Sequence, residues 1–442
     1  MEQKKYAIII LGASGDLAKR KLIPALERLF TRGEIDSSTI IVGSGRTDFS
    51  DEAFRSHCGV SGPFAHQLFY HKNITGLRSY LSEKGEFGRI IIFMSLPPQV
   101  YAQTAAELSA EGFERTTSII IEKPFGFDYE SAVELNKHLT SYFNESNIYR
   151  NDHYLAKEAV QNILVFRFAN ALFYPFWNNT YIESIQISSS EIQGVGKRGN
   201  YFDHAGIIRD MVQNHLMQML CLITMDPPLS LLADDISARK IEVLRTIHID
   251  QCFRSQYEGY SSEPGVQPAS KTETFAELKL SIDNPRWAGV PVYLRSGKAL
   301  NRDGTHIGVR FKRLPISLFN EQNLQQNTIV FTIQPMAGIL MRMVSKVPGD
   351  EMILKNTNLT FCYHSSFGGE IPEAYQRLLL DAIHGDHTLF VDAHETELSW
   401  QLLGSVLDTG SLDHYPQGTM PQTKLAIEWI DFKSYHNTCL SK

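Results

Sequence analysis

Four runs of mainly apolar residues near the start of the chain constrain its fold more than any other feature. They are rich in β-branched side chains and lie at residues 6–11, 39–43, 89–95 and 117–121. Continuous runs of this kind are typical of strands that are buried on both faces of a parallel sheet. Helix-like stretches, such as residues 101–108, separate them. The alternation predicts a doubly wound, Rossmann-like α/β domain with its ligand crevice at the carboxyl ends of the strands.

The first run leads through a glycine turn, Gly12-Ala13-Ser14-Gly15-Asp16-Leu17, into a basic, helix-like segment. A strand, a glycine turn and a helix N-terminus together form an anion site, because free backbone N–H groups and the helix dipole face a pyrophosphate. Ser14 and Leu17 stand where the GxGxxG pattern has its second and third glycines. By itself, the turn is equally compatible with a plain βα connection.

Two basic residues follow other strands. Arg46 lies in Ser44-Gly45-Arg46-Thr47, where an NAD site would carry a carboxylate for the ribose 2′-hydroxyl. An arginine among hydroxyls suits a 2′-phosphate and predicts NADP; the alternative is an exposed loop charge. Lys123 follows the fourth run, so we expect it at the mouth of the crevice, in contact with cofactor and substrate or in a salt bridge with Glu122.

The size and composition of the chain point to two domains. At 442 residues the chain is too long to fold around a single hydrophobic core. Strand patterning changes from continuous to alternating near residue 150, so we expect an NADP-binding domain at residues 1–150 and a larger substrate-binding and oligomerisation domain at residues 151–442. This second domain is predicted to be α+β with a mainly antiparallel sheet.

Charge and cysteine usage restrict the partners and the compartment. A net charge of −7 argues against a general nucleic-acid or anionic-membrane binder. Five cysteines without a CxxC pair predict free thiols in a reducing compartment and no zinc site. No apolar run approaches the length of a membrane span. We therefore expect a cytoplasmic protein.

The stretch from Arg150 to Glu158 places an acid, an imidazole, a phenol and an ammonium close together in sequence. If Lys157 begins a helix, His153 and Lys157 share a face at i and i+4, and two cationic donors suit a phosphate or a carboxylate. A hydrogen-bonded domain junction is an equally open interpretation.

A long helix is expected over residues 203–220. On it Asp210 and Asn214 share a face, whereas His215 is well rotated from Asp210. A histidine that acts as a general base needs a carboxylate to orient it, and we assign Asp152 to this role. By itself, His215 is more often a buried, hydrogen-bonded helix histidine.

Further elements are expected in the second half of the chain. Alternating residues 182–191 predict an antiparallel strand ending in Glu191, which is either an exposed carboxylate or an acceptor for sugar hydroxyls. Residues 243–255 are expected to be helical and residues 261–270 to form a mobile loop.

Three segments, in order, resemble the glucose-6-phosphate dehydrogenases. They are residues 12–22, residues 122–126 and residues 152–158. The family signature Arg-Ile-Asp-His-Tyr-Leu-Gly-Lys-Glu reads here with Asn151 and Ala156 in place of its isoleucine and glycine. The resemblance implies NADP-dependent oxidation of glucose 6-phosphate at C1 to 6-phospho-D-glucono-1,5-lactone, the first oxidative step of the pentose phosphate pathway, without a metal.

The resemblance also implies roles for individual residues. His215 would be the general base, oriented by Asp152. Substrate contacts would come from Lys123, His153, Tyr154, Lys157, Glu191, Asp210, Lys298 and Gln334. Cofactor contacts would come from Gly12, Ser14, Gly15, Asp16, Leu17, Lys21, Arg46, Pro97, Tyr101 and Lys123. The large antiparallel sheet of the family usually forms a dimer face, so we expect a homodimer or homotetramer.

One position departs from the family pattern. The family has a second basic residue five positions after the equivalent of Lys298, and here that position is Asp303, with Arg302 beside it. Either Arg302 takes over this contact or the pocket lacks it. Asp303 is the one feature that favours an NADP-binding regulator without catalysis. Another two-domain sugar oxidoreductase, of the glucose–fructose oxidoreductase type, would lack the segment 152–158.

Overall fold

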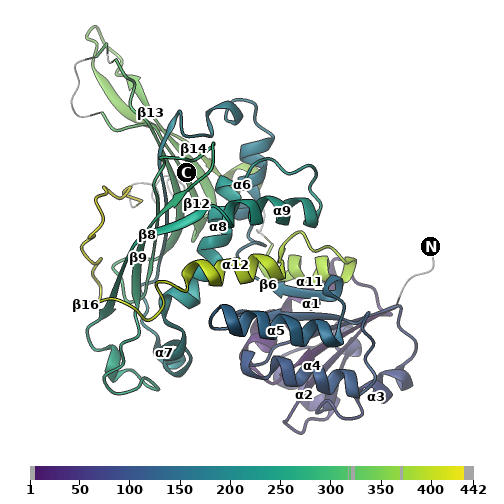
Figure 1. Cartoon of the computed structure of the whole chain (residues 1–442). Helices are drawn as coiled ribbons and strands as arrows, with labels where there is room; N and C mark the ends of the chain where they lie inside the picture. The colour runs from purple at the N-terminus through teal and green to yellow at the C-terminus, as the bar shows by residue number, and fades with distance from the viewer. Residues whose placement is uncertain (1–4, 317, 320–323, 369–371, 433–442) are drawn as a thin grey trace. The chain divides into compact units, whose positions relative to one another are not determined.

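The computed structural model describes residues 5–316, 318–319, 324–368 and 372–432, and the chain divides into two compact units (Figure 1). Unit 1 comprises Met1–Ala156, Pro228–Ala238 and Pro372–Glu397, and unit 2 comprises Lys157–Pro227, Arg239–Ile371 and Leu398–Lys442. The division after Ala156 lies close to the boundary expected near residue 150. The two later segments of unit 1, however, were assigned to the second domain on sequence grounds.

The sheet of unit 1 has seven strands in the order β15-β6-β5-β4-β1-β2-β3. All pairings are parallel except that of the edge strand β15 with β6. The strands are β1 Tyr6–Leu11, β2 Ile40–Gly45, β3 Leu68–Lys72, β4 Arg89–Met94, β5 Ser118–Glu122, β6 Ile148–Asn151 and β15 Phe390–Val391. The predicted Rossmann-like sheet is confirmed, and the four predicted strands are β1, β2, β4 and β5.

Burial on both faces explains the continuous apolar pattern of β1. Ala7, Ile9 and Leu11 point to one side and share a core with residues of α3, α4 and α5. Ile8 and Ile10, on the opposite side, are also buried. A polar residue at any of these positions would lose its water without gaining a partner, so a continuous apolar run is what a sheet covered on both faces requires.

The helical segments of unit 1 are η1 Ala18–Leu22, α1 Ile23–Thr31, α2 Asp51–Cys58, η2 Pro63–Gln67, α3 Leu77–Lys84, η3 Pro98–Val100, α4 Tyr101–Ala110, α5 Tyr129–Tyr142, η4 Glu145–Asn147 and α11 Ala374–His384. Local chemistry sets where they begin: Asp128 Oδ1 caps α5 by accepting a hydrogen bond from Ser131 N at 2.9 Å. α11 packs against α1 and η1, so a late segment of the chain completes the first unit.

The sheet of unit 2 has nine strands in the order β14-β13-β12-β11-β7-β10-β9-β8-β16 and is mainly antiparallel, as predicted. Only the pairs β7 with β10 and β8 with β16 are parallel. The strands are β7 Ile182–Ser190, β8 Ile247–Tyr257, β9 Phe275–Ile282, β10 Val292–Gly297, β11 Gly304–Phe311, β12 Thr328–Gln334, β13 Gly338–Lys346, β14 Leu354–Cys362 and β16 Leu412–Tyr415.

The predicted helix over residues 243–255 is wrong beyond Leu244. Helix α9, Ala233–Leu244, ends at Leu244, and strand β8 begins at Ile247. Pairing with β9 explains the outcome, because Ile247 lies opposite Ile282 and Ile249 opposite Leu280. In the loop expected to be mobile, Gln267 N donates a hydrogen bond to an oxygen of Asp203 at 3.0 Å.

The single long helix predicted for residues 203–220 is also wrong. The chain forms α7 Gly199–Ile207, the π-helix η7 Ile208–Leu216 and α8 Met217–Thr224. The break falls at Gly206, whose φ is +69° and where a Cβ would stand 2.4 Å from Glu273 Oε1. That carboxylate oxygen accepts a hydrogen bond from Ile208 N at 3.1 Å and so begins the new helix. A buried glutamate therefore decides where the helix breaks.

The remaining helical segments are α6 Glu158–Phe168, η5 Tyr174–Phe176, η6 Gly196–Arg198, η8 Tyr260–Ser262, α10 Tyr363–Phe367 and α12 Ala393–Leu403. α6 packs on α8 and β12, and η7 packs on β7 and β10. In the part of the chain that the structure describes, none of the helices has the length and apolarity needed to cross a lipid bilayer.

The cysteines follow the prediction only in part. Cys58, Cys221 and Cys252 are free thiols, as expected. Cys362 instead takes part in a disulfide, which corrects the expectation for that residue. Cys439 lies outside the described residues.

Candidate active site

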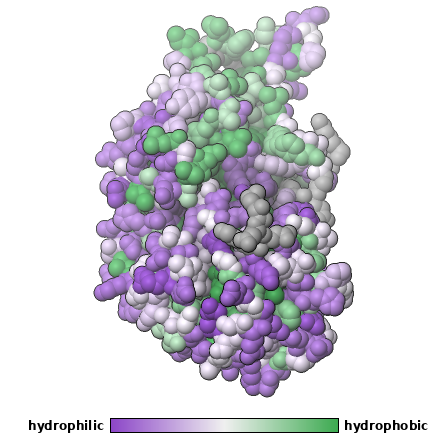
Figure 2. Space-filling view, turned by 90° about the vertical axis from the view of Figure 1, so that its right-hand side faces the viewer, coloured by the Kyte–Doolittle hydropathy of each residue, from purple (hydrophilic) through white to green (hydrophobic). Residues whose placement is uncertain are grey.

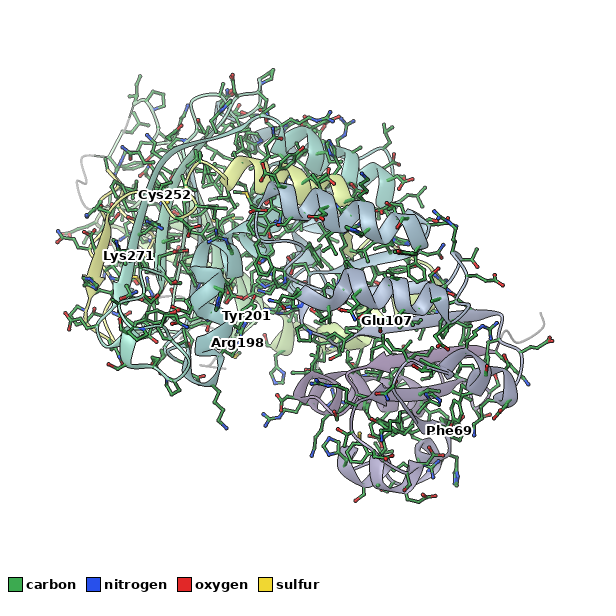
Figure 3. The ribbon with its side chains drawn as sticks, turned by 60° about the horizontal axis from the view of Figure 1, so that its bottom comes forward. Phe69, Glu107, Arg198, Tyr201, Cys252 and Lys271 are labelled. Carbon is green, nitrogen blue, oxygen red and sulfur yellow. The ribbon has the colours of Figure 1, made fainter. Side chains whose placement is uncertain are left out.

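A cavity of about 830 Å³ lies in unit 1 at the carboxyl ends of β1, β2 and β4, where the doubly wound fold places its ligand. Five predicted cofactor residues line it: Gly12, Ser14, Gly15, Arg46 and Pro97. Glu107 of α4 lies on its wall and is labelled in Figure 3. The turn after β1 and the end of β2 thus share one cavity.

Close packing explains why glycine begins the turn after β1. Gly12 has a φ of +75°, and a Cβ there would stand 2.2 Å from the carbonyl oxygen of Ser95. Gly15 N donates to Gly12 O at 2.9 Å and closes the turn. The missing second glycine of the GxGxxG pattern therefore does not prevent a tight connection between β1 and the helix that follows.

Three other predicted cofactor residues do not line the cavity: Asp16, Lys21 and Tyr101. Each of them has a partner within unit 1. Asp16 pairs with Arg20 at 2.6 Å on the surface, and Lys21 pairs with Glu373. Tyr101 is buried, and its hydroxyl donates to the carbonyl oxygen of Glu122 at 3.0 Å. Leu17, half-buried, precedes η1. Their contact with a cofactor stays a prediction.

The cavity wall formed after β3 was not predicted from the sequence. Asn73, Ile74 and Thr75 line the cavity beside Arg46. Ser44 Oγ donates to the carbonyl oxygen of Asn73 at 2.8 Å, which fixes this wall to the end of β2. The strand before this wall, Leu68–Lys72, is only five residues long and ends in a histidine and a lysine. It therefore lacks the continuous apolar pattern by which β1, β2, β4 and β5 were predicted.

Lys123 directly follows β5 and is half-buried, and it is joined to Pro124 by a cis peptide bond. Its neighbour Glu122 accepts hydrogen bonds from Asn151 Nδ2 at 2.6 Å and Tyr375 Oη at 3.1 Å. Desolvation raises the pKa of Glu122 to about 7, although these hydrogen bonds and the Lys123 charge oppose the shift. The carboxyl group therefore holds the ends of β5 and β6 together beside Lys123.

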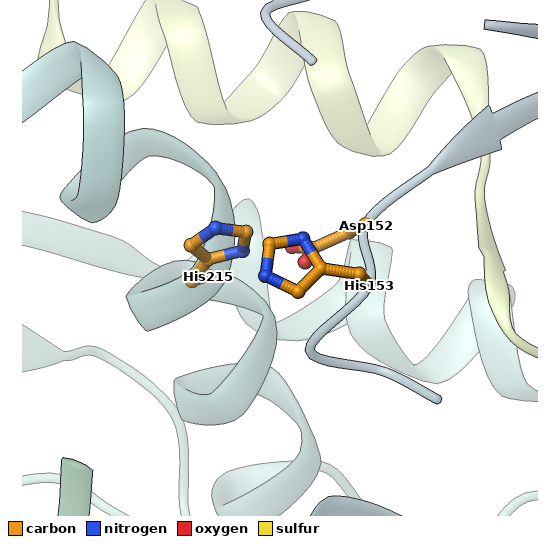
Figure 4. Close-up of side chains that lie close together, drawn as sticks. All are labelled: Asp152, His153 and His215. Carbon is orange, nitrogen blue, oxygen red and sulfur yellow. The ribbon is translucent and has the colours of Figure 1, made fainter. Parts of the chain in front are cut away.

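The segment after β6 carries Asp152 and His153 (Figure 4). Asp152 is buried, and its Oδ1 accepts a hydrogen bond from Tyr154 N at 2.9 Å. The ring of His153 stacks on Tyr375 at 6.3 Å between centroids. The shared helix face proposed for His153 and Lys157 is wrong, because residues 153–156 form turns and Lys157 is the extended residue before α6.

In unit 2 three predicted substrate residues come together. Lys298 Nζ contacts Glu191 Oε2 at 2.7 Å and Asp210 Oδ2 at 3.9 Å. Parallel pairing explains the first contact, since Ser190 at the end of β7 lies opposite Gly297 at the end of β10. Parallel strands end at the same edge, so the next residue of each lies beside the other. Lys298 and Asp210 are both buried, which strengthens their attraction.

Arg198 and Tyr201, which the sequence analysis did not single out, complete this cluster (Figure 3). Arg198 Nη2 and Tyr201 Oη each lie 3.5 Å from Asp210 Oδ1. The guanidinium of Arg198 lies 4.9 Å from the ring centroid of Tyr201. Burial and the Asp210 charge raise the pKa of Tyr201 above its usual value, so the hydroxyl stays protonated as a donor. The sequence did not indicate that these residues lie close together, because their proximity depends on the break in the helix at Gly206.

His215 lies near the end of η7 and is buried (Figure 4). A π-helix closes each turn between residues five apart; accordingly, the C-cap Met217 N donates to the carbonyl oxygen of Val212. Residues 210 and 215 therefore stand one turn apart on the same side of η7. The expectation that His215 is well rotated from Asp210 assumed α-helical geometry and is wrong.

Lys157 and Gln334, also predicted to contact substrate, are partners in unit 2. Lys157 Nζ donates to Gln334 Oε1 at 2.5 Å. Lys157 stands before the first turn of α6 and Gln334 ends β12, on which α6 packs. The ammonium is thus held at the end of a strand by a neutral amide oxygen.

Asp303, which stands where the family has a basic residue, makes a backbone contact in this structure. Asp303 Oδ1 accepts a hydrogen bond from Ile192 N at 2.6 Å, directly after Glu191. Arg302 Nη1 lies 3.8 Å from Asp431 Oδ1. Asp303 therefore acts on the backbone beside the Glu191–Lys298 pair, and Arg302 has an acidic partner of its own.

The chain is similar to known proteins over most of its length. Residues 9–162 match the glucose-6-phosphate dehydrogenase NAD binding domain, and residues 164–433 match the glucose-6-phosphate dehydrogenase C-terminal domain. The chain is 40% identical to glucose-6-phosphate 1-dehydrogenase of Chlamydia muridarum, covering 91% of this chain and 90% of the relative. It is 39% identical to the enzyme of Bacillus subtilis, covering 95% of each.

A solved glucose-6-phosphate dehydrogenase in complex with its substrate glucose-6-phosphate is also similar. It superposes with a TM-score of 0.89 at 32% identity and covers 96% of this chain and 97% of its own. The similarity thus extends through both units and is not confined to the nucleotide-binding fold.

Proposed function

The chain belongs to the glucose-6-phosphate dehydrogenase family, and we infer from this that it oxidises glucose 6-phosphate at C1 with NADP as the hydride acceptor. The products are 6-phospho-D-glucono-1,5-lactone and NADPH. The observation that carries the inference is that both units match the family and that the Chlamydia muridarum and Bacillus subtilis relatives are covered over 90% and 95% of their own length. A regulator without catalysis is not favoured, because Asp152, Lys157 and His215 are all present.

We propose that His215 is the general base. It would accept the proton of the C1 hydroxyl while the hydride of C1 leaves for NADP, so that the carbonyl of the lactone forms. Asp152 would hold the imidazole in the tautomer that can accept this proton and would stabilise the imidazolium. Burial of both side chains supports these roles, since a water-excluded base is oriented by fixed neighbours.

We propose that the substrate is held at its two ends. His153, Tyr154 and Lys157 would bind the 6-phosphate, because ammonium, imidazole and phenol donors suit a dianion. Glu191, Asp210 and Lys298 would bind sugar hydroxyls, with Gln334 nearby and Lys123 bridging sugar and cofactor. The ion pairs of Lys298 support this part, since carboxylates fixed by a buried lysine present acceptors in a set geometry.

Steady-state reduction of NADP and, separately, NAD by the purified protein tests the function. Glucose 6-phosphate is the substrate and free glucose is the control. We expect fast reduction with the phosphorylated sugar and NADP, and slow reduction with free glucose. Absence of reduction with either cofactor, in protein shown to bind NADP, would favour the regulator.

Arg46→Ala is expected to raise the KM for NADP by about 10- to 100-fold, because it removes a charge-assisted contact to the 2′-phosphate. The KM for NAD, which lacks that phosphate, should change less than about twofold. Arg32→Ala, on the exposed C-terminal end of α1, is the matched control. An unchanged ratio of NADP to NAD efficiency in Arg46→Ala would show that another residue reads the 2′-phosphate.

We propose that the protein forms at least a homodimer. Unit 2 exposes an apolar groove of about 640 Å³ along β12 and β13, and hydrophobic side chains gather in the upper part of the face in Figure 2. Leu172, which lines the groove, is 67% exposed. An apolar surface of this kind is typical of an interface between proteins.

We therefore expect the wild-type protein to be dimeric in sedimentation velocity. The dissociation constant of the Leu172→Asp dimer should be at least about tenfold higher than that of the wild type. Leu229→Asp is the control, because Leu229 is 85% exposed but does not line the groove. Monomeric wild-type protein at micromolar concentration would contradict the proposal.

We also propose a cytoplasmic location. Three free thiols, Cys58, Cys221 and Cys252, support it, since free thiols persist in a reducing compartment. Thiol trapping in intact cells, followed by mass spectrometry, would check it. Complete oxidation of Cys58, Cys221 and Cys252 in the cell would count against the proposal.

A further inference from the structure

The backbone around Glu191 is held from one side by the residues that follow β10. Glu191 N donates to Gly297 O at 2.9 Å, and Leu300 N donates to Glu191 O at 2.9 Å. Ala299 N donates to Gln193 O at 3.0 Å. These bonds continue the parallel ladder of β7 and β10 beyond their ends, on the side where Lys298 reaches the Glu191 carboxylate.

The other side of this segment faces β11. β11 is antiparallel to β7, and its first residue, Gly304, lies opposite Ser190. Two residues further along, the main-chain ladder has ended, and Ile192 N donates to the side chain of Asp303 at 2.6 Å. Ile192 is itself 52% exposed, so its side chain does not hold the segment in a core.

We propose that Asp303 is a positioning residue that sets the Glu191 carboxylate against Lys298 for substrate binding. Only a side chain with an acceptor oxygen can take the Ile192 N–H, and lysine and arginine have none. At this position a carboxylate can therefore accept a backbone hydrogen bond that a lysine or an arginine cannot accept. The inference rests on the proposed function, in which Glu191 and Lys298 contact the sugar.

Three replacements of Asp303 separate its possible roles. Asp303→Ala removes the acceptor, Asp303→Asn keeps an acceptor oxygen without the charge, and Asp303→Lys supplies a basic group without an acceptor. Asp36→Ala is the matched control, because Asp36 Oδ1 accepts a backbone hydrogen bond from Ser38 N, also at 2.6 Å, in unit 1 outside the cavity.

The KM for glucose 6-phosphate should rise about five- to tenfold in Asp303→Ala and in Asp303→Lys, with kcat and the KM for NADP within twofold of wild type. Asp303→Asn should stay within about twofold of wild type, as should Asp36→Ala. A purely structural role would not separate the KM for sugar from the KM for NADP or be rescued by asparagine.

Three kinetic results would overturn the proposal. The first is a KM within twofold of wild type in Asp303→Ala. The second is equal damage in Asp303→Asn and Asp303→Ala, which would make charge decisive. The third is a KM below wild type in Asp303→Lys, which would mean that the pocket lacks a basic contact.

Hydrogen exchange keeps this inference distinguishable from the proposed function. Amide exchange in the peptide spanning residues 190–195 should accelerate in Asp303→Ala and not in Asp36→Ala. If the wild-type protein reduced no NADP with glucose 6-phosphate, the proposed function would fail. Unchanged exchange in Asp303→Ala would instead refute the role of Asp303 itself, whatever the activity.

Discussion

His215→Ala is expected to lower kcat for glucose 6-phosphate oxidation by about three orders of magnitude, since positioned general bases contribute about 10²- to 10⁴-fold. Without an imidazole, the C1 hydroxyl proton has no acceptor at the moment the hydride leaves. The KM values for sugar and NADP should stay within about threefold, because the base contacts a proton that moves only in the transition state. Steady-state kinetics, with NADP binding measured by calorimetry, separates the two effects.

His204→Ala is the matched control for this experiment. His204 lies on α7, is exposed, and its Nδ1 lies 2.7 Å from the carbonyl oxygen of Asn200. Its replacement should leave kcat within about twofold of wild type. Turnover near that of wild type in His215→Ala would show that another group takes the proton.

Lys157→Ala is expected to raise the KM for glucose 6-phosphate by about 10- to 100-fold, because it removes a charged donor to the 6-phosphate. Its Nζ is already anchored by Gln334 at 2.5 Å, so little side-chain entropy is lost when the phosphate binds. We expect kcat to change much less, since the phosphate is far from the reacting carbon. Initial rates over a range of sugar concentrations measure both constants.

Free glucose serves as the internal control for Lys157→Ala. Without a phosphate to bind, its kcat/KM should be about the same in the variant and the wild type. Lys137→Ala, which removes an exposed lysine of α5, controls for the change in net charge. An equal loss of kcat/KM for glucose and for glucose 6-phosphate would refute the assignment of Lys157 to the phosphate.

Several elements were predictable because their signals are local. The continuous apolar runs at β1, β2, β4 and β5 follow from burial on both faces, and the turn at Gly12 follows from the sharp connection after β1. β3, with its polar end, escaped detection, and with it the cavity wall at Asn73. β8 was mistaken for a helix because its residues pair with residues of β9 that lie 20 to 35 positions later in the sequence, as Ser255 with Phe275 and Ile247 with Ile282 show.

The pairings within the candidate site were only partly accessible. Residues Glu191, Asp210 and Lys298 were identified from the family resemblance, but the contact of Glu191 with Lys298 depends on the register of β7 with β10, and that of Asp210 on the packing of η7 against these strands. The orientation of His215 was misjudged because the sequence pattern is compatible with an ordinary α-helix. Nothing in residues 208–216 alone indicates a π-helix, and the start of this helix at Ile208, whose N donates to the Glu273 carboxylate, depends on a residue distant in the sequence.

By itself, the sequence determined the strand-and-helix alternation of the first unit, the family and the identity of the reactive side chains. These depend on side-chain chemistry and on patterns that span a few residues. The tertiary structure alone decided that the helix breaks at Gly206, that Lys298 faces two carboxylates, and that Asp303 binds a backbone amide of the segment after β7. Each of these rests on a contact between residues far apart in the chain, and such contacts exist only after the strands have paired and buried their partners.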